Sequence, residues 1–304
     1  MAQVSIIIPA YNEAGAIADT VRAARQAFDG SAHEVEIVVV NDGSRDETGR
    51  IAEEAGARVI HHPVNIGYGN ALKSGLAHAS HSIIAMTDAD GTYPIAELPG
   101  MVSELDEQGF DMIVGARRGR HYLGNPIKRA ARWVFRFLAE FATGQRIPDV
   151  NSGFRVVRRE LMEKVAMLAG GGFSFSTTLT VIALLTSHFV RFREIEYFAR
   201  IEESKVRHLR DALRASQILV RAILMFNPIK LYLVYAGMIA FTGICVAAAY
   251  LLLPWLSGLI LVLGAYAMGV LAILGLGLLA EQIAVYFMIG SAWLPQANLR
   301  RRHE

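Results

Sequence analysis

Two aspartates one residue apart are the side chains of this sequence best suited to hold a metal ion. Asp88 and Asp90 follow the short apolar run 82–86, and Gly91 comes directly after them. A short apolar run bounded by turn-forming residues predicts a buried strand. Both carboxylates would then lie at the carboxyl end of that strand, where open α/β sheets bind ligands, and hard divalent cations prefer such oxygen ligands. The alternative is a turn with solvated acids, because Asp is common in turns.

Two earlier strand ends carry similar polar clusters. The apolar runs 4–8 and 36–40 also have the length and composition of buried strands. The clusters that close them contain Pro9, Tyr11, Glu13 and Asp42. Helical segments alternate with these runs, which predicts a mainly parallel sheet covered by helices. Because parallel strands place their carboxyl ends at one edge, we expect the clusters to converge with Asp88 and Asp90 into a site for a nucleotide and a metal ion.

A basic stretch without acidic residues runs from residue 114 to residue 136. Its cations are Arg117, Arg118, Arg120, Lys128, Arg129, Arg132 and Arg136. The last three recur at helical spacing, and Phe137 lies elsewhere on the same predicted helix. A basic amphipathic helix beside a membrane suits an anionic lipid headgroup. A solvated basic face is the alternative.

The carboxyl-terminal third of the chain is strongly apolar. Hydrophobic residues make up 53% of the sequence, and no Asp, Glu, Lys or Arg occurs from residue 231 to residue 280. A hydrocarbon core of about 30 Å needs roughly 20 helical residues, so this stretch is long enough for two crossings. We expect helices at 231–253 and 259–280, joined by a turn at 254–258. A buried hairpin in a soluble core is the alternative.

Charged residues flank this predicted hairpin. Arg221 and Lys230 precede it, and three arginines at 300–302 follow it. By the positive-inside rule both termini and the amino-terminal domain would face the cytoplasm, which predicts a multi-pass protein of the cytoplasmic (inner) membrane. A second basic stripe comprises Arg207, Arg210, Arg214 and Arg221. It predicts an interfacial helix that leads into the membrane, with an ordinary surface helix as the alternative. The net charge of +2 is too small to argue for nucleic acid.

Four motifs in order resemble those of family 2 glycosyltransferases with the A-type fold. They lie at residues 8–13, 40–44, 88–90 and 149–155, so the resemblance covers about half of the chain. With the hairpin added, the chain resembles the polyprenyl-phosphate sugar synthases, such as dolichyl-phosphate mannose synthase and bacterial undecaprenyl-phosphate hexose synthases. The resemblance implies an α/β, Rossmann-like catalytic domain with a mainly parallel sheet, followed by an interfacial helix and a two-helix transmembrane hairpin.

The resemblance also implies roles for the polar clusters. The residues that would hold the base and ribose of a nucleotide-sugar are Pro9, Tyr11, Glu13 and Asp42. Asp88 would lie beside the ribose or the metal, and Asp90 would ligate Mg²⁺ or Mn²⁺ against the diphosphate. Such a cation can stabilise the negative charge that a departing nucleoside diphosphate gains. Some dolichol-type members carry a metal-binding Gln where this chain has Thr92, so the metal shell would rely more on water.

A second set of residues is expected to serve the lipid acceptor. The residues expected to bind its phosphate are Arg117, Arg129, Ser152, Arg155 and Lys205. Arg can meet phosphate oxygens in bidentate fashion, which positions them for attack. Asp149 is expected to orient the acceptor region or contact the sugar, with a turn cap after Pro148 as the alternative.

These expectations combine into one predicted activity and domain plan. A membrane-bound glycosyltransferase would move a sugar from a UDP- or GDP-sugar to polyprenyl phosphate, with inversion at the anomeric carbon implied by the resemblance. The predicted parts are a cytoplasmic catalytic domain (1–205), a juxtamembrane amphipathic helix (206–228), and a transmembrane hairpin with a basic tail (229–304). Glycines in the spans make a homo-oligomer plausible, and no nucleic-acid partner is expected.

Two other functions compete with this one. Residues 129–133 nearly spell the Gln-x-x-Arg-Trp signature of processive polysaccharide synthases, but Arg129 stands where that signature has Gln. Two helices would also make a poor polymer channel. A non-catalytic membrane adaptor that binds nucleotide-sugar would have no need of intact Asp88 and Asp90.

Overall fold

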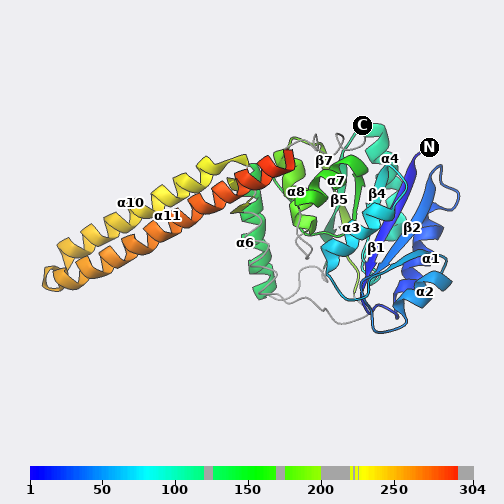
Figure 1. The fold of residues 1–304 in the computed structure, drawn as a ribbon, viewed down its shortest axis with the longest axis horizontal. Helices are drawn as coiled ribbons and strands as arrows, with labels where there is room; N and C mark the ends of the chain where they lie inside the picture. Colours follow the sequence, from blue (N-terminus) through cyan, green and yellow to red (C-terminus); the bar gives the residue numbers. More distant parts are fainter. Residues whose placement is uncertain (120–125, 169–174, 200–219, 222, 225, 294–304) are drawn as a thin grey trace, which may run out of the picture. The chain divides into compact units, whose positions relative to one another are not determined.

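The computed structural model describes residues 1–119, 126–168, 175–199 and 220–293, with residues 222 and 225 excepted (Figure 1). The chain divides into two compact units, Met1–Ile218 and Leu219–Glu304. The first is an α/β domain and the second is a helical hairpin. The expected boundary after residue 205 and most of the expected juxtamembrane helix lie outside the described residues, so that part of the domain plan stays a prediction.

A seven-stranded sheet forms the centre of the first unit. In spatial order its strands are β3 (Arg58–His61), β2 (Glu34–Asn41), β1 (Gln3–Ala10), β4 (Ile83–Met86), β6 (Arg155–Arg158), β5 (Met112–Arg118) and β7 (Val190–Glu196). Strand β6 runs antiparallel to both of its neighbours, and the other adjacent pairs are parallel. The expected mainly parallel sheet is therefore confirmed, and the antiparallel β6 is a feature that strand–helix alternation did not predict.

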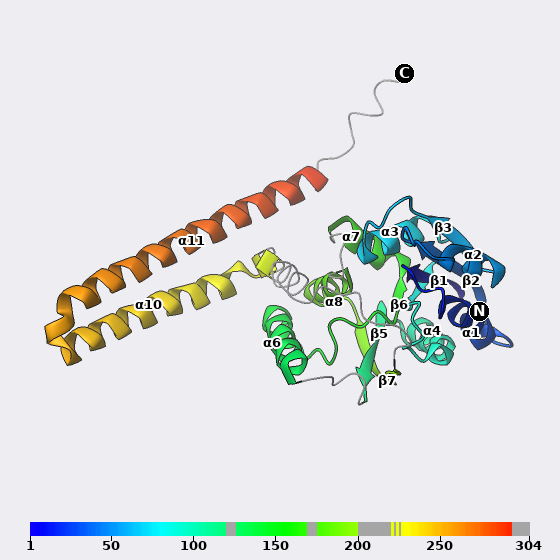
Figure 2. The same cartoon turned by 90° about the horizontal axis from the view of Figure 1, so that it is seen from below.

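Helices cover both faces of this sheet (Figure 2). On one face α1 (Ile17–Phe28) contacts α2 (Thr48–Glu54) and α4 (Leu98–Gln108), with the short turn η1 (Ile95–Glu97) beside them. On the other face α3 (Tyr68–His78), α7 (Arg159–Leu168) and α8 (Phe175–Leu185) contact one another. A further helix, α6 (Pro126–Thr143), contacts α8.

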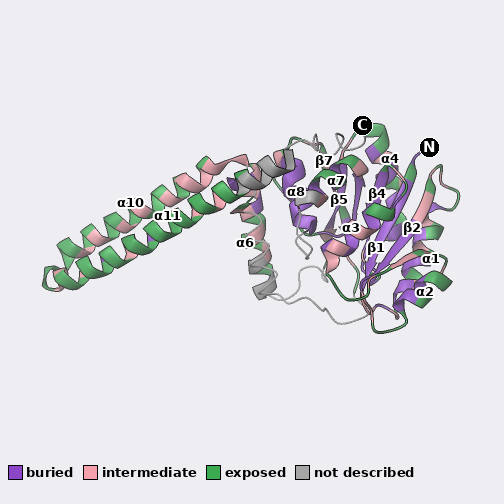
Figure 3. Ribbon diagram, in the orientation of Figure 1, coloured by how far each residue is buried: buried purple, intermediate pink, exposed green. Residues whose placement is uncertain are grey.

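Alternation along β1 explains how a single strand serves both layers. Ile6 and Ile8 belong to the same buried cluster as Val21 of α1 and Met101 of α4. Ile7 points to the opposite face, because successive side chains of a strand alternate, and it is fully buried there. The strand is accordingly apolar throughout its centre rather than alternating, which is typical of a sheet buried on both faces. Figure 3 shows this buried sheet in purple.

The second unit is a hairpin of two long apolar helices. Its parts are α10 (Pro228–Leu252), the short turn η2 (Pro254–Leu256) and α11 (Ser257–Trp293). The stretches Pro228–Leu252 and Pro254–Ala284 are each long and apolar enough to cross a membrane, by length and composition. Both helices are largely exposed in Figure 3. The turn lies where it was expected, and α11 continues past the charge-free stretch instead of ending near residue 280.

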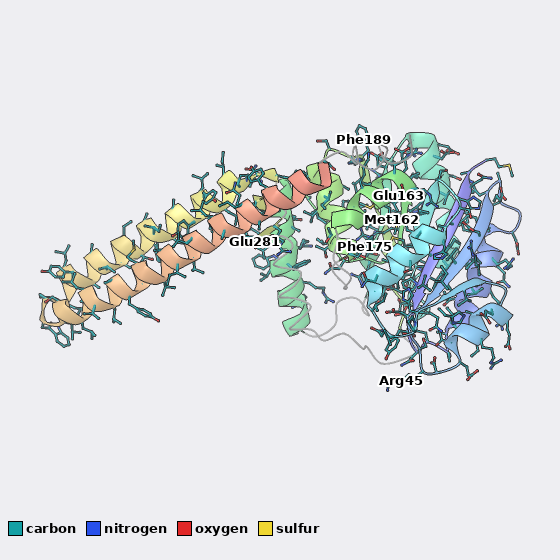
Figure 4. All side chains as sticks on the ribbon, viewed as in Figure 1. Arg45, Met162, Glu163, Phe175, Phe189 and Glu281 are labelled. Atoms are coloured by element: carbon teal, nitrogen blue, oxygen red, sulfur yellow. The ribbon has the colours of Figure 1, made fainter. Side chains whose placement is uncertain are left out.

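Polar contacts join the two helices of this hairpin. The Tyr235 hydroxyl donates to the carbonyl oxygen of Leu271 at 2.5 Å, and the Tyr232 hydroxyl lies 2.5 Å from Gln282 Oε1. Glu281, which is labelled in Figure 4, forms an ion pair with Arg221. The hairpin is therefore held by specific hydrogen bonds in addition to apolar packing.

Candidate active site

Three parallel strands bring the polar clusters to one edge of the sheet. Strand β1 lies between β2 and β4. At its carboxyl end the Asp42 amide donates to the Ala10 carbonyl (2.9 Å), and the Thr87 amide donates to the Ile7 carbonyl (3.4 Å). The chain segments that follow the three strands, including the one that carries Asp88, therefore begin side by side. The expected convergence of strand ends is confirmed.

Hydrogen bonds tie the residues that follow β1 to those that follow β2. The pairs are Asn12 N to Ser44 Oγ (2.9 Å), Glu13 N to Thr48 Oγ1 (2.8 Å), Ala14 N to Asp46 Oδ2 (3.3 Å), and Arg45 N to Asn12 Oδ1 (2.7 Å). Of the residues predicted to bind nucleotide here, Pro9 and Glu13 are buried and Tyr11 is half-buried. Because both loops are fixed to each other, Tyr11 is presented from a preorganised edge.

The Asp42 carboxylate fixes the segment that leads into α3. Its Oδ1 lies 2.8 Å from His62 Nδ1 and accepts a hydrogen bond from the Ile66 amide at 3.0 Å. Its Oδ2 accepts from the Gly67 amide at 2.9 Å, and His62 Nε2 lies 2.9 Å from Ser74 Oγ. Asp42 was predicted to bind nucleotide, and that role stays a prediction. In the structure this carboxylate positions the amino-terminal end of α3.

Residues of two other segments, Tyr68 and Gly153, lie against the Asp88 carboxylate. The Tyr68 hydroxyl, at the start of α3, donates to Asp88 Oδ1 at 3.1 Å. Gly153 approaches the same group so closely that a Cβ on it would lie 2.7 Å from Oδ1, 3.1 Å from Oδ2 and 2.9 Å from the Tyr68 hydroxyl oxygen. This approach follows from the antiparallel pairing in which Arg155 lies opposite Met86, since residues that precede β6 then lie beside residues that follow β4. Burial of the Tyr68 hydroxyl, and then the charge of Asp88, raise the pKa of Tyr68 well above its ordinary value.

Asp90 is almost fully buried and is held by its own turn. Its Oδ1 accepts hydrogen bonds from the Thr92 amide (3.2 Å) and from the Thr92 hydroxyl (2.6 Å). Thr92, where some relatives would have a metal-binding Gln, thus orients Asp90.

The donor set at this edge fits a hard divalent cation. Within the described residues, no group of three or more His, Cys, Asp or Glu side chains is arranged to hold a metal by itself. Mg²⁺ at phosphate-transfer sites usually takes only one or two carboxylates and completes its shell with water and substrate phosphates. Asp88 and Asp90 match this pattern, and their oxygen donors are of the type that Mg²⁺ and Mn²⁺ prefer.

Asp149 forms a buried ion pair with Arg117. Arg117 Nε lies 2.6 Å from Asp149 Oδ2, and Arg117 Nη2 lies 3.0 Å from Oδ1. Burial by itself raises the pKa of Asp149, but the charge and hydrogen bonds of Arg117 and the amide of Asn151 outweigh it, so the pKa lies below its ordinary value. An ionised carboxylate that is held in this way is a poor general base and a good orienting group.

Aromatic rings surround this ion pair. The Arg117 guanidinium lies over the Tyr197 ring, 5.5 Å from its centroid. Tyr197 meets Tyr93 edge-on, and Tyr93 stacks on Phe154 with ring centroids 5.3 Å apart. The Tyr93 hydroxyl accepts a hydrogen bond from the Gly153 amide at 2.9 Å. These contacts fix the loop that carries Asp149.

Arg155 and Ser152, both predicted to bind the acceptor phosphate, are fully buried. The Arg155 guanidinium donates to the carbonyl oxygens of Ser152 (2.7 Å) and Val150 (3.0 Å) and to Thr180 Oγ1 (2.7 Å). Burial lowers the pKa of Arg155 to about 10, so the side chain remains cationic near neutral pH. This arrangement does not present Arg155 or Ser152 to a lipid phosphate. Arg155 instead joins the 149–153 loop to α8.

The other candidates for binding the acceptor phosphate differ from Arg155 and Ser152 in their exposure. Arg129 is exposed on α6, and Trp133 and Phe137 of the same helix are 59% and 53% exposed. Their two rings stack with centroids 5.9 Å apart. Lys205 lies outside the described residues. Of the described candidates, Arg129 is therefore exposed, whereas Arg117 is only partly exposed and is paired with Asp149.

Sequence reasoning missed the residues that hold the acidic side chains in place. Tyr68 and His62 each contact an aspartate that lies 20 positions away in the sequence. The only local signal was the glycine-containing turn before α3, where Gly67 has a φ of 97° that favours glycine. A turn of this kind indicates a constrained entry to a helix, but it does not identify the partner.

Comparison with known proteins agrees with this geometry. Residues 5–166, more than half of the chain, match Glycosyl transferase family 2. A dolichyl-phosphate hexose transferase of Haloferax volcanii is 30% identical over 203 residues, which cover 66% of this chain and 86% of that protein. An undecaprenyl-phosphate 4-deoxy-4-formamido-L-arabinose transferase of Pseudomonas fluorescens is 33% identical over 195 residues, 62% of this chain and 54% of that protein. The match thus spans about half the length of this bacterial relative.

Solved structures share the fold of the first unit. Glucosyl-3-phosphoglycerate synthase from Mycobacterium tuberculosis, in complex with phosphoglyceric acid, superposes with a TM-score of 0.61 at 22% identity, over 73% of this chain and 80% of that chain. The same enzyme in complex with Mn²⁺, uridine diphosphate and glucosyl-3-phosphoglycerate gives a TM-score of 0.57 at 22% identity, over 73% and 79%. The chain belongs to glycosyl transferase family 2 and is a glycosyltransferase with an A-type α/β fold.

Proposed function

We propose that this glycosyltransferase moves a sugar from a UDP- or GDP-sugar to the phosphate of a membrane polyprenol. The observation that carries the proposal is that one chain joins a family 2 domain with paired Asp88 and Asp90 to a hairpin of two candidate membrane spans. The names of the curated relatives, which refer to dolichyl phosphate and undecaprenyl phosphate, support the same acceptor class. The products would be polyprenyl-phosphate-sugar and a nucleoside diphosphate.

The donor would bind at the edge formed by the ends of β1, β2 and β4. Tyr11 and the surrounding loops would contact the nucleotide, with Pro9, Glu13 and Asp42 shaping the pocket around the base and ribose. Asp88 and Asp90 would hold Mg²⁺ or Mn²⁺ at the diphosphate. When bound, that cation supplies Lewis-acid stabilisation of the leaving diphosphate.

The acceptor phosphate would be the nucleophile. One of its oxygens forms a bond to the anomeric carbon while the bond from that carbon to the donor diphosphate breaks, and inversion is the expected stereochemistry. A phosphate ester is already ionised near neutral pH, so the step needs positioning more than a general base. Arg117, oriented by Asp149, would direct the phosphate. Positive charge would also come from Arg129, which is exposed, and from Lys205.

Helix α6 would hold the catalytic domain at the lipid surface. It presents Trp133 and Phe137 to solvent on the same helix as Arg129. Aromatic side chains suit the interface of a bilayer, and arginines suit anionic headgroups. We extend this to an integral protein of the cytoplasmic membrane, with both termini and the catalytic domain in the cytoplasm. Association of the hairpins into a homo-oligomer also stays a prediction.

The alternatives receive less support. No curated relative compared above is named for polysaccharide synthesis, and Arg129 replaces the Gln of the processive signature. An adaptor without activity has less support, because the chain belongs to a glycosyltransferase family and carries both Asp88 and Asp90.

A transfer assay with a labelled sugar tests the proposal. Purified full-length protein in detergent would be incubated with Mg²⁺, undecaprenyl phosphate and each of a panel of labelled UDP- and GDP-sugars. We expect one donor to yield label that extracts into organic solvent. The proposed function would be contradicted if no donor yielded organic-soluble label, or if the label were found in a polymer.

A further inference from the structure

We propose that Tyr68 is the positioning residue for Asp88, and that its hydroxyl sets the geometry with which this carboxylate meets the metal–diphosphate. The inference rests on the proposed function, because it assigns Asp88 to that group. It adds a residue from α3, an element that none of the expected motifs includes.

The contact geometry leaves Asp88 little freedom. Tyr68 donates to Oδ1 at 3.1 Å from the α3 side, and Gly153 approaches both carboxylate oxygens from the loop that precedes β6. An ionised carboxylate can only accept hydrogen bonds, so the tyrosine hydroxyl must be the donor. Rotation of Asp88 would break that hydrogen bond, and Gly153, whose Cβ position lies 2.9 Å from the Tyr68 hydroxyl oxygen and 2.7 Å from Asp88 Oδ1, limits the space beside both groups.

Tyr68 is itself fixed by the site. It is the first residue of α3, and the amide of the preceding Gly67 donates to Asp42 Oδ2 at 2.9 Å. Asp42 also lies against His62, which contacts Ser74, six residues after Tyr68 on the same helix. The end of β2 thus positions the start of α3, and the start of α3 positions the carboxylate at the end of β4.

Such a hydrogen bond has a defined chemical effect. Carboxylates that ligate metals are commonly held by outer partners, and loss of such a partner typically costs about 10- to 100-fold in metal affinity or activity. The donated hydrogen bond keeps one oxygen of Asp88 in place before the donor arrives. Phenylalanine at residue 68 would keep the ring and remove the hydroxyl that donates this bond.

The decisive variant is therefore Tyr68→Phe in the full-length protein. We would measure Mn²⁺ affinity by the loss of the free-Mn²⁺ electron paramagnetic resonance signal, in the presence of UDP and, in parallel, of GDP. We expect Tyr68→Phe to weaken Mn²⁺ binding about 10-fold. We also expect saturating Mn²⁺ to restore much of the transfer rate, because the defect lies in metal binding.

Tyr93→Phe is the matched control. The Tyr93 hydroxyl also forms a hydrogen bond with the 149–153 loop, but it accepts this bond from the Gly153 amide. The Tyr93 ring stacks on Phe154. Loss of the hydroxyl is expected to lower the melting temperature and to weaken Mn²⁺ binding less than Tyr68→Phe does. Gly153→Ala provides a second variant, because its Cβ would press on both the Tyr68 hydroxyl and Asp88 Oδ1, and it is expected to weaken Mn²⁺ binding. Gly100→Ala on α4 is its control, because a Cβ there meets nothing nearer than 3.5 Å.

The outcomes separate this inference from the proposed function. Wild-type Mn²⁺ affinity in Tyr68→Phe overturns the inference, and so does an equal loss of affinity in Tyr93→Phe, which would indicate a general structural effect. Absence of Mn²⁺ binding by the wild-type protein overturns it as well. A selective Mn²⁺ defect in a protein that shows no lipid-dependent transfer supports the role of Tyr68 and contradicts the proposed acceptor.

Discussion

Arg117 meets Asp149 through two nitrogens at once, with Nε 2.6 Å from Oδ2 and Nη2 3.0 Å from Oδ1. The pair joins strand β5 to the loop that precedes β6, and that loop also contacts Asp88 through Gly153. The cation proposed to direct the acceptor phosphate and the carboxylate proposed to serve the donor are therefore attached to one loop. This arrangement couples the two halves of the site through the position of that loop.

Asp149→Asn should separate an effect on Arg117 from loss of a general base. The amide keeps the size of the side chain but removes the charge that orients Arg117, and breaking one side of a buried ion pair costs about 3 kcal/mol. We expect a rise in KM for the lipid acceptor and a lower melting temperature, with little change in KM for the donor. Asp106→Asn, on the exposed side of α4, is the control. A loss confined to kcat, with the pH–rate profile flattened, would instead indicate that Asp149 acts as a base.

The same ion pair predicts a dependence of stability on acid. Because the pKa of Asp149 is lowered in the folded protein, the unfolded chain binds a proton at higher pH than the folded chain does. The stabilisation is therefore fully present above the ordinary pKa of Asp and is lost as the pH falls through the folded value. The melting temperature of wild type should exceed that of Asp149→Asn near neutrality. At about pH 3 the difference between the two proteins should be smaller. An undiminished difference at the lower pH would contradict the assignment.

The sequence alone predicted the parts of the fold that depend on local pattern. Apolar runs of strand length located β1, β2 and β4, and the charge-free stretch located α10 and α11. These signals lie within each segment, so no knowledge of the neighbouring elements was needed. The acidic strand ends could be placed together because parallel strands share an edge.

The remaining features depend on contacts between distant segments. Nothing in the motif around Arg155 distinguishes a buried cation bonded to Val150 and Thr180 from an exposed one that awaits a phosphate. The partners of Asp42 and Asp88 became visible only once α3 was placed against the sheet. Side-chain hydrogen bonds of this kind follow from register and packing, which the pattern of residue types does not specify.

Arg155→Met should test the supporting role that burial assigns to this cation. Methionine fills similar volume but removes the hydrogen bonds that Arg155 donates to the carbonyl oxygens of Val150 and Ser152. Loss of hydrogen bonds to a charged group costs about 1.5–3 kcal/mol each, so we expect a marked drop in melting temperature. Arg146→Met, at an exposed position, is the control. A variant with unchanged melting temperature but a raised KM for the lipid would favour direct phosphate binding by Arg155.

A pair of glycines in α11 tests the packing of the hairpin. A Cβ on Gly275 would lie 2.5 Å from the Tyr235 hydroxyl, whereas a Cβ on Gly277 meets nothing within 4 Å. Gly275→Leu should therefore displace Tyr235 from its hydrogen bond and lower the thermal stability of the full-length protein in detergent, while Gly277→Leu should not. Equal stability of the two variants would show that α10 and α11 do not pack in this register.

The central claim is tested most directly by nucleoside diphosphate release from purified full-length protein with Mg²⁺. The panel would comprise UDP- and GDP-sugars, with and without undecaprenyl phosphate, and Asp90→Asn would serve as the variant without an intact metal site. We predict release that requires both one particular donor and the lipid, and that falls by roughly 10³-fold in Asp90→Asn. Release that is independent of the lipid, or equal in wild type and Asp90→Asn, would contradict the account.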